Sequence, residues 1–330
     1  MNHAGTQHPL VPLDPERMAA ARELAGKHAP FAPLSFLRGA RPQALRDWLC
    51  EGAFPGGEGC LAFEHGPPGA RWLLVANRLA WDSQWLGRSI ARLDLAMPVS
   101  PPFERPHAPP EAALAALCEE LRRRGVDYLF AVAPVRHIAL VKALGAAGFS
   151  LLETRLAFWH GQLAAFVPPR RSPVRLARAG DVEALGEVAA NTVNAFDRFH
   201  AEDWFDRGAV DRVMREWVNA SVNRGFADAV LVPDLPGKPP RALMTLKYHQ
   251  PRWPALGVKA SQMVLAAVAP DATGWFHRLV VESMMHVRER GAEALYLTTQ
   301  ATNRATLRVF ESLGYRYGEC SLVFRKVLRS

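Results

Sequence analysis

The sequence predicts an α/β protein, of the α+β kind with a mixed sheet, built from two tandem copies of one unit. Residues 122–158 and 288–324 align without a gap at an offset of 166, with nine identities in 37 positions. Each copy shows a helix that ends in glycine (Gly125, Gly291), an apolar strand, a second helix and an alternating strand. Chance sharing of a common α-β-α-β unit is the alternative explanation, and the absence of gaps favours two copies.

The boundaries of the two copies follow from proline-rich stretches. The segment 166–173 contains three prolines and cannot continue a helix or a central strand. Pro98–Pro110 predicts a loop, because a helix pattern with leucines on one face begins just after it. The expected organisation is an N-terminal extension (1–40), a first domain (41–166), a linker (167–173) and a second domain (174–330).

The second half of the chain gives a clear order of elements. Apolar periodicity predicts two helices, at 182–191 and along 210–222, and a third at 276–290. Strands are expected at 174–177, 229–232, 243–247 and 260–269, followed, after the third helix, by strand, helix and closing strand. The strands from 229 to 269 predict an antiparallel meander. The β-α-β that follows implies a parallel pair.

Composition indicates an ordinary folded protein of about two domains. The 330 residues carry 40 basic and 32 acidic side chains, a net charge of +8, with 49% hydrophobic residues. These values exclude a mainly disordered chain, a collagen-like chain and a disulfide scaffold. Arginine outnumbers lysine by 34 to 6, which is typical of a GC-rich genome; recognition of phosphate or carboxylate groups is the other interpretation. The arginines are scattered, so no nucleic-acid partner is expected.

The four cysteines indicate reduced thiols rather than a structural site. Cys50, Cys60, Cys118 and Cys320 form no C-x-x-C pair and have no histidine at zinc spacing, so no metal is expected. Charged residues interrupt the first thirty positions, and the longest apolar runs are about eight residues. We therefore expect no secretory signal and no membrane partner, and a cytoplasmic location.

Motifs in both halves resemble the GNAT acyltransferase superfamily. The order β-α-α-β-β-β-α-β-α-β, with Asn303-Arg-Ala305, Phe310 and Leu313-Gly-Tyr315, carries this resemblance. Further stretches are similar to the branch of dTDP-fucosamine (dTDP-4-amino-4,6-dideoxygalactose) acetyltransferases. These stretches are Trp81-Asp82 within Leu79–Arg92, Asp197-Arg198-Phe199-His200 followed by Trp217, Thr299-Gln300 with Asn303 and Ala305, and Gly148–Glu153. The likeness covers about residues 75–325.

The resemblance implies acetyl-CoA or another acyl-CoA as co-substrate. In the superfamily a glycine-rich loop after the central strand holds the pyrophosphate on backbone N–H groups. Here Thr273 stands where the motif has Arg or Gln, Phe276 at its first glycine and Arg278 at its last. A side chain at a glycine position hinders close approach of phosphate to the backbone, so Phe276 is a marked departure, and His277 and Arg278 offer charge instead. The expected cofactor-binding residues are Ala266, Val268, Thr273, Gly274, Arg278 and Asn303.

The first copy lacks a comparable loop. Pro102–Glu111 occupies the corresponding place, and prolines cannot supply consecutive N–H donors. Only the second domain is therefore expected to hold the acyl donor. Trp81 and Asp82 are placed at a strand start in the first domain, with Trp81 in a packing role.

The resemblance also locates the catalytic positions. A Tyr in the helix after Asn303 usually protonates the departing thiolate, and this chain has Phe310 there. Either another group replaces the Tyr, for which Tyr315, Tyr317 and His200 are the substitutes, or the proton comes from water; Tyr315 and His200 are taken as the catalytic candidates. Each also has a packing interpretation. Asn303 either bonds the cofactor or caps a helix.

The acceptor pocket of the superfamily maps onto the region of Arg198 and His200, our substrate-binding candidates. Arg198 suits the diphosphate of a nucleotide-sugar, and a surface ion pair with Asp197 or Glu202 is the alternative. The resemblance thus implies an N-acyltransferase acting on a small amine, with a nucleotide-linked amino sugar as a specific candidate. The alternative is a GNAT-shaped protein without acyl transfer: a ligand-binding or regulatory subunit, or an enzyme with other chemistry in the same cleft.

Overall fold

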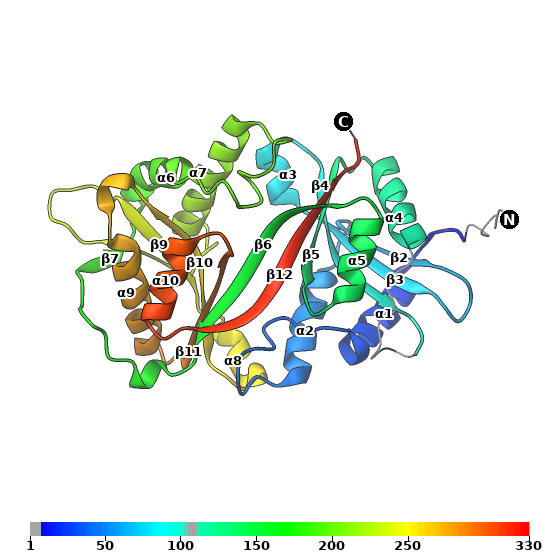
Figure 1. The fold of residues 1–330 in the computed structure, drawn as a ribbon, viewed down its shortest axis with the longest axis horizontal. Coiled ribbons are helices and arrows are strands. Elements are labelled where there is room, and N and C mark those ends of the chain that lie inside the picture. The colour runs from blue at the N-terminus through cyan, green and yellow to red at the C-terminus, as the bar shows by residue number, and fades with distance from the viewer. Residues whose placement is uncertain (1–7, 102, 104–110, 330) are drawn as a thin grey trace. The chain divides into compact units, whose positions relative to one another are not determined.

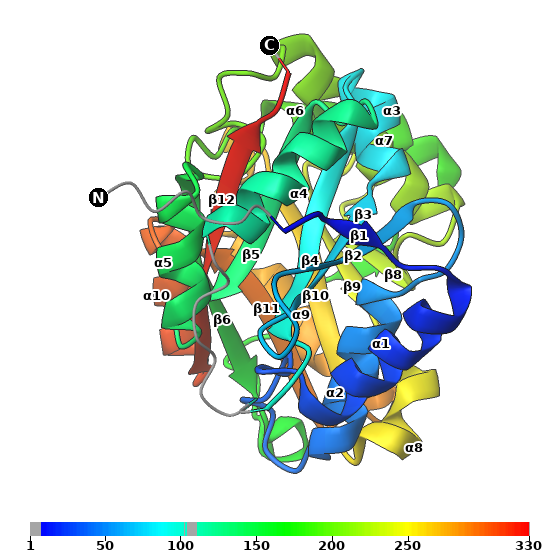
Figure 2. The same ribbon diagram turned by 90° about the vertical axis from the view of Figure 1, so that its right-hand side faces the viewer.

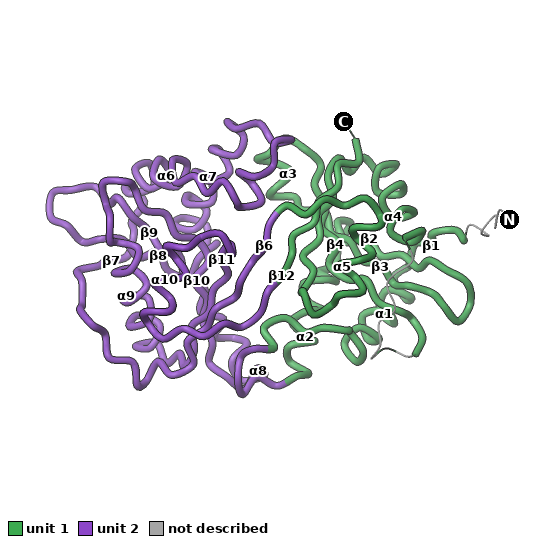
Figure 3. The backbone as a smooth tube through the Cα atoms, viewed as in Figure 1, with its two compact units in different colours: residues 1–35, 42–152, 321–330 green, residues 36–41, 153–320 purple. Residues whose placement is uncertain are grey.

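The computed structural model describes residues 8–101, 103 and 111–329 and divides the chain into two compact units. Unit 1 comprises residues 1–35, 42–152 and 321–330, and unit 2 comprises residues 36–41 and 153–320 (Figure 3). Residues 102 and 104–110, which belong to the loop predicted at Pro98–Pro110, lie outside the described residues.

Unit 1 is built on a mixed sheet with the strand order β1-β2-β3-β4-β5-β12. Its strands are β1 (Val11–Pro12), β2 (Cys60–His65), β3 (Trp72–Arg78), β4 (Ile90–Pro98), β5 (Tyr128–Pro134) and the last part of β12 (Arg316–Val327) (Figure 1). All neighbours are antiparallel except β4 and β5, which run parallel. Helix α4 (Glu111–Arg123) connects this parallel pair, as a β-α-β crossover requires.

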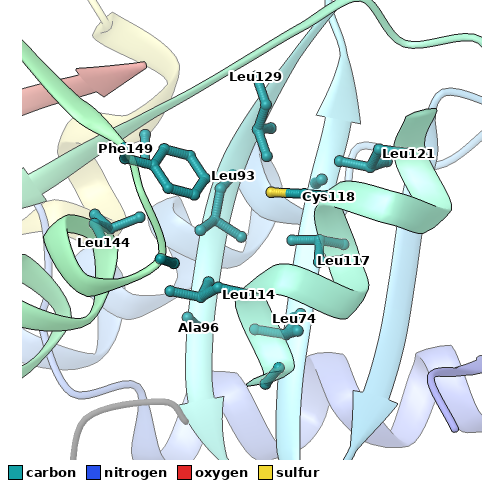
Figure 4. Packing of buried hydrophobic residues seen from close by; sticks show 14 of the residues in the cluster. Leu74, Leu93, Ala96, Leu114, Leu117, Cys118, Leu121, Leu129, Leu144 and Phe149 are labelled. Carbon is teal, nitrogen blue, oxygen red and sulfur yellow. The ribbon is translucent and has the colours of Figure 1, made fainter. Parts of the chain in front are cut away.

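Helices cover both faces of this sheet, because alternate strand residues enter two separate cores. Leu74 of β3 packs with Leu114 and Leu117 of α4 and with α5 (Ile138–Ala146), as Figure 4 shows for part of this cluster. Leu73, its neighbour in β3, packs in the second core with Ala25 of α1 (Pro15–His28) and with α2 (Pro42–Ala53). Both helices belong to the N-terminal segment that precedes β2, drawn in blue in Figure 2.

Unit 2 follows the predicted order of elements closely. Its sheet has the order β6-β11-β10-β9-β8-β7, with an antiparallel meander from β8 to β10 and a parallel β10–β11 pair. The strands are β6 (Ser150–His160), β7 (Val174–Leu176), β8 (Ala229–Pro233), β9 (Ala242–Lys247), β10 (Ala260–Val268) and β11 (Ala294–Gln300). The predicted meander and parallel pair are confirmed.

The helices of unit 2 begin and end within a few residues of their expected bounds. They are α6 (Val182–Asn191), α7 (Arg207–Asn223), α9 (Trp275–Glu289) and α10 (Arg304–Ser312), with a short α8 (Trp253–Leu256) that the sequence did not indicate. Helix α9 packs against β8, β9 and β10, while α6 contacts α7 and β10. Every residue of β8 is buried, as expected for a strand covered on both faces.

The last strand of each sequence repeat pairs with a strand of the other repeat. β6 follows α5 in the chain, yet it pairs with β11, for example Phe158 with Leu297. β12 follows α10, yet its end pairs with β5, Phe324 with Ala131. The predicted boundary at 167–173 follows the sequence repeat, whereas the compact units follow strand pairing. The segment itself is anchored to α9, because Arg171 Nε and the Ser172 N–H both donate to the buried Glu282 carboxylate.

One local expectation is wrong. Trp81 and Asp82 do not start a strand; they lie in α3 (Ala80–Leu86), a two-turn helix between β3 and β4. The helix ends at Gly87, whose φ of 68° is the left-handed conformation that glycine adopts without a Cβ clash. Within the described residues, the structure contains no helix of sufficient length and apolar character to span a membrane.

Candidate active site

The parallel strands β10 and β11 diverge toward their carboxyl ends. They pair over three positions only, from Ala260 opposite Ala294 to Gln262 opposite Tyr296. A bulge in β10 between Met263 and Ala266 follows at once, and there the Leu265 N–H bonds to the Thr245 hydroxyl instead of a ladder carbonyl (2.8 Å). Bulges bend a strand and leave backbone groups outside the ladder. The described ends of β10 and β11 are thus free of pairing with each other.

Unit 1 repeats this arrangement. β4 and β5 pair in parallel over four positions, and Asp94 is the extra residue at a bulge in β4 just beyond them. The Asp94 carboxylate accepts from Asn77 Nδ2 (2.7 Å) and contacts Arg92, and burial raises its pKa. The same geometry at equivalent places in both units supports the repeat seen in the sequence.

The loop between α6 and α7 reaches the carboxyl ends of both diverging strands of unit 2. The Thr192 hydroxyl lies 3.5 Å from the carbonyl oxygen of Val268, the last residue of β10. Asn194 Nδ2 donates to Oε1 of Gln300, the last residue of β11 (2.6 Å). The segment 192–200, here called the bridging loop, is therefore hydrogen-bonded to the end of β11 and begins beside the end of β10, while the Thr192 hydroxyl donates to the Val188 carbonyl (2.7 Å).

The bridging loop ends in an aspartate–histidine pair. Asp197 Oδ1 accepts the backbone N–H groups of Phe199 (2.8 Å) and His200 (2.9 Å), and Oδ2 lies 2.7 Å from His200 Nδ1. The His200 side chain is 1% exposed, and its Nε2 has no hydrogen-bond partner among the described residues. The carboxylate accepts only, so in the neutral ring the proton is on Nδ1 and the lone pair is on Nε2.

The residues expected to bind phosphate lie at the start of α9. Gly274 is the N-cap, with φ 86°, and a Cβ there would meet no atom within 4 Å. Thr273 is exposed and bonds its hydroxyl to the Pro270 carbonyl (3.1 Å). Arg278 is exposed, and its guanidinium carbon lies 5.0 Å from the centre of the Trp275 ring. The first turn of this helix offers backbone N–H groups that the helix itself does not use.

Phe276 and Phe310, the two residues expected to depart from the superfamily pattern, contact each other. Phe276 and Phe310 have ring centroids 6.0 Å apart in an edge-on arrangement. Phe310 is fully buried and also packs on Phe158 (5.8 Å) and Tyr315 (5.1 Å). The Phe276 ring thus enters an aromatic core cluster.

Tyr315 lies inside this cluster. Its hydroxyl is buried and has no partner in the described parts of the chain, and burial raises its pKa above the ordinary value of 10. A proton held this tightly is poorly matched to a thiolate near neutral pH. Tyr317, by contrast, is 57% exposed, with its ring on Phe158.

The remaining predicted residues take these places. Asn303 is the N-cap of α10, and its Oδ1 accepts the Thr306 N–H (3.3 Å), so the capping role is present. The Arg198 guanidinium stacks 3.9 Å from the centre of the Phe199 ring. Phe199 in turn contacts Trp217, which joins the two parts of the Asp197–Trp217 motif. Ala266 and Val268, both half-buried, lie in the end of β10 that pairs with β9 but not with β11.

Nothing in the sequence indicated a series of hydrogen-bonded side chains that leads from the buried Glu153 through Gln300 to the bridging loop. Glu153, in β6, accepts from Arg155 (2.7 Å) and from Gln300 Nε2 (2.7 Å). Gln300 then accepts from Asn194, as described above. The identity of Glu153 with Glu319 in the repeat was visible, but Gln300, the partner that joins Glu153 to the loop, is 147 residues away in the chain.

Two further features of the described residues bear on function. A surface groove of about 930 Å³ in unit 1 is lined by Arg78, Arg88, Ser89, Arg124 and Asp127, among others, at the amino ends of β4 and β5. It therefore lies at the end of this pair opposite to the diverging one. Within the described ranges, no group of three or more His, Cys, Asp or Glu side chains is arranged to hold a metal ion.

Solved structures identify the fold. A tandem GNAT protein from the clavulanic acid biosynthesis pathway matches 98% of this chain over 99% of its own, with a TM-score of 0.54 and 14% identity. The chain has the tandem GNAT fold. A GCN5-related N-acetyltransferase from Sphaerobacter thermophilus matches 99% of the chain over 97% of its own (TM-score 0.62, 12% identity). No family model and no curated protein matches the sequence.

The candidate site residues described above lie in unit 2. The predicted tandem arrangement is confirmed, and the diverging β10–β11 pair, the start of α9 and the bridging loop all belong to one unit. At these identities the likeness concerns the fold alone. What the site does must therefore be argued from its own residues.

Proposed function

We propose that this protein is an N-acyltransferase that moves an acyl group from a coenzyme A thioester to a small amine, using unit 2. The observation that carries the proposal is the Asp197–His200 pair, held on a loop that is hydrogen-bonded to the carboxyl end of β11 and begins beside that of β10. A buried, unpartnered ring nitrogen with its tautomer set by a carboxylate is the arrangement of a general base.

Residues at the start of α9 suit the phosphates of coenzyme A. The first-turn N–H groups and the positive end of the helix dipole favour an anion there, and Gly274 leaves the approach to its backbone open. Arg278 adds an exposed positive charge. Phe276 does not obstruct this role, because its ring packs on Phe310. Acyl-CoA supplies the activated acyl group, and its path runs along Ala266–Val268, the part of β10 that pairs with β9 and not with β11.

His200 supplies the proton chemistry in this proposal. Its Nε2 takes a proton from the attacking amine, and Asp197 stabilises the resulting imidazolium. The reaction forms one C–N bond and breaks one C–S bond; the amine loses a proton and the departing thiolate needs one. A single histidine balances both transfers, which removes the need for a tyrosine at position 310. Tyr315 stays the alternative acid.

For the acceptor, we propose an amine that carries a phosphate or diphosphate, with a nucleotide-linked amino sugar as the specific candidate. Arg198, two residues before His200, is steadied by its stacking on the Phe199 ring. A planar guanidinium pairs well with phosphate oxygens. The similarity of the Asp197–Trp217 motif to the amino-sugar branch supports the same acceptor class.

The test is release of free coenzyme A from acetyl-CoA with a panel of amines that includes dTDP-linked amino sugars. His200→Gln should lower kcat by ~100- to 10,000-fold, the usual contribution of general base catalysis. His286→Gln is the matched control, because His286 is a hydrogen-bonded histidine of the same unit, 2.8 Å from the Tyr248 hydroxyl. Equal rates in the wild type and the His200 variant would contradict the proposed role.

The alternative function is a GNAT-shaped protein that binds a ligand or runs other chemistry in the same cleft. The contact between Phe276 and Phe310 favours it, since both residues depart from the acyl-transfer pattern and have been absorbed into packing. If no amine of the panel is acylated by a folded wild-type protein, this alternative replaces our proposal.

A further inference from the structure

A buried carboxylate lies behind the bridging loop without touching the proposed reacting groups. The Glu153 side chain is 0% exposed and accepts from Arg155 through Oε2 and from Gln300 through Oε1, both at 2.7 Å. Burial of a carboxylate is costly even when it is paired, and an apolar side chain is often as stabilising. A buried glutamate at this position therefore calls for an explanation besides stability.

The chemistry of the carboxylate gives the chain of hydrogen bonds a direction. An ionised carboxylate only accepts, so Gln300 must turn its NH2 group toward Glu153 and its oxygen toward the loop. Asn194 can then donate Nδ2 to that oxygen (2.6 Å), which leaves its own Oδ1 to accept the Phe196 N–H (3.1 Å). A reversed Gln300 amide would bring two NH2 groups together and break this contact.

Asn194 is in turn hydrogen-bonded to the aspartate–histidine pair. The backbone carbonyl of Asn194 accepts the N–H of Asp197 (3.1 Å), and Asp197 holds His200. The orientation of the Gln300 side-chain amide therefore fixes Asn194, the residue whose carbonyl closes the turn that leads to Asp197 and His200. At the start of the loop, the Thr192 hydroxyl donates to the Val188 carbonyl (2.7 Å) and lies 3.5 Å from that of Val268.

We infer that Glu153 is a positioning residue for the reaction: through Gln300 and Asn194 it fixes the bridging loop and thereby the place of the His200 imidazole. This inference rests on the proposed function for its effect on turnover. Its effect on the loop itself does not depend on any activity. The two can therefore be measured separately.

The decisive variant is Glu153→Gln. An amide has one accepting oxygen, so it cannot serve both Arg155 and Gln300, and the Gln300 amide loses its fixed direction. We expect amide hydrogen exchange at Phe199 and His200, whose N–H groups bond to Asp197, to become about 10-fold faster, which corresponds to ~1.4 kcal/mol. We expect kcat to fall by a similar factor while KM for acetyl-CoA changes little.

A second substitution restores the direction of the chain. In Glu153→Gln combined with Gln300→Glu, the amide at 153 accepts from Arg155 and donates to the carboxylate at 300, which still accepts from Asn194. Exchange rates and kcat should return toward wild-type values. Rescue of this kind is not expected of a residue that acts only through packing.

Glu282→Gln is the matched control. Glu282 has a side chain only 1% exposed and accepts from Arg171 and the Ser172 N–H, away from the bridging loop. Glu282→Gln should lower the free energy of unfolding about as much as Glu153→Gln does, but leave amide exchange in the bridging loop and kcat unchanged. The inference is overturned if exchange at Phe199 and His200 does not respond to Glu153→Gln, or if the paired substitution fails to rescue it. If loop exchange responds but the wild type acylates no amine, the proposed function fails and the positioning of the loop stands.

Discussion

Asp197→Asn keeps two hydrogen bonds of the bridging loop and reverses the direction of the third. In the wild type, Oδ1 accepts two backbone N–H groups and Oδ2 pairs with His200 Nδ1 at 2.7 Å. Asparagine retains the oxygen for both N–H groups and places an NH2 donor against Nδ1. The histidine proton must then move from Nδ1 to Nε2, which leaves the nitrogen that we propose as the base without a lone pair.

The magnitudes follow from these bonds. A charge-assisted bond of ~1.5–3 kcal/mol is exchanged for a neutral one of ~0.5–1.5 kcal/mol, so the free energy of unfolding should fall by about 1 kcal/mol. That corresponds to a Tm lower by roughly 2–4 °C. Turnover should fall much further, by ~100- to 10,000-fold, because a general base is lost.

Nitrogen-edited NMR of the imidazole ring reads the tautomer directly and needs no substrate. The wild type should show a protonated Nδ1 and the variant a protonated Nε2 at neutral pH. Thermal unfolding and the coenzyme A release assay complete the comparison. An unchanged tautomer in Asp197→Asn, or full turnover with the reversed tautomer, would refute the reasoning.

Three further predictions concern packing and pH. Phe310→Tyr should destabilise the protein by ~1–3 kcal/mol in urea unfolding, because Phe310 is fully buried and the added hydroxyl has aromatic neighbours; an unchanged midpoint would show a polar partner. Leu117→Ala, in the fully buried core of unit 1, should cost ~2–5 kcal/mol by the same measurement. Burial lowers the pKa of His286 in the folded protein to about 4, against 6.5 in the unfolded chain. The neutral ring therefore contributes fully to the free energy of unfolding above pH 6.5, and this contribution is lost as pH falls from 6.5 toward 4. His286→Phe should therefore flatten the fall in stability over that interval, and an equally steep fall would count against this assignment.

Local patterns predicted the elements of unit 2 well. Helix α9, expected at 276–290, spans Trp275–Glu289, and β10, expected at 260–269, spans Ala260–Val268. Apolar periodicity and glycine stops are properties of neighbouring residues, so they can be read along the chain. The short helix α3 escaped notice because seven residues carry too little periodicity to distinguish it from a strand start.

The pairing of the closing strands could not be predicted in the same way. The two repeats carry the same pattern in their last strands, with Phe158 and Phe324 at equivalent positions. Either strand therefore fits the edge of either sheet by hydrophobic alternation alone. The pairing of β6 with β11 and of β12 with β5 is a property of the folded chain.

The candidate site was predicted in part. His200 and Arg198 were identified from a motif, but the Asp197 partner of His200 was taken as a possible partner of Arg198 instead. Phe276 and Phe310 each looked like an isolated departure, because residues 34 positions apart show no sign in the sequence that their rings will touch. The role of Glu153 depends on partners in three separate elements and was invisible for the same reason.

Calorimetric titration of the full chain with acetyl-CoA tests the central claim most directly. We predict saturable binding with one site per chain, weak because the phosphate loop lacks its glycines. Hydrogen exchange in the same samples should slow at the start of α9 and along 299–303, in unit 2 and not in unit 1. No heat at millimolar acetyl-CoA, or protection confined to unit 1, would contradict the account.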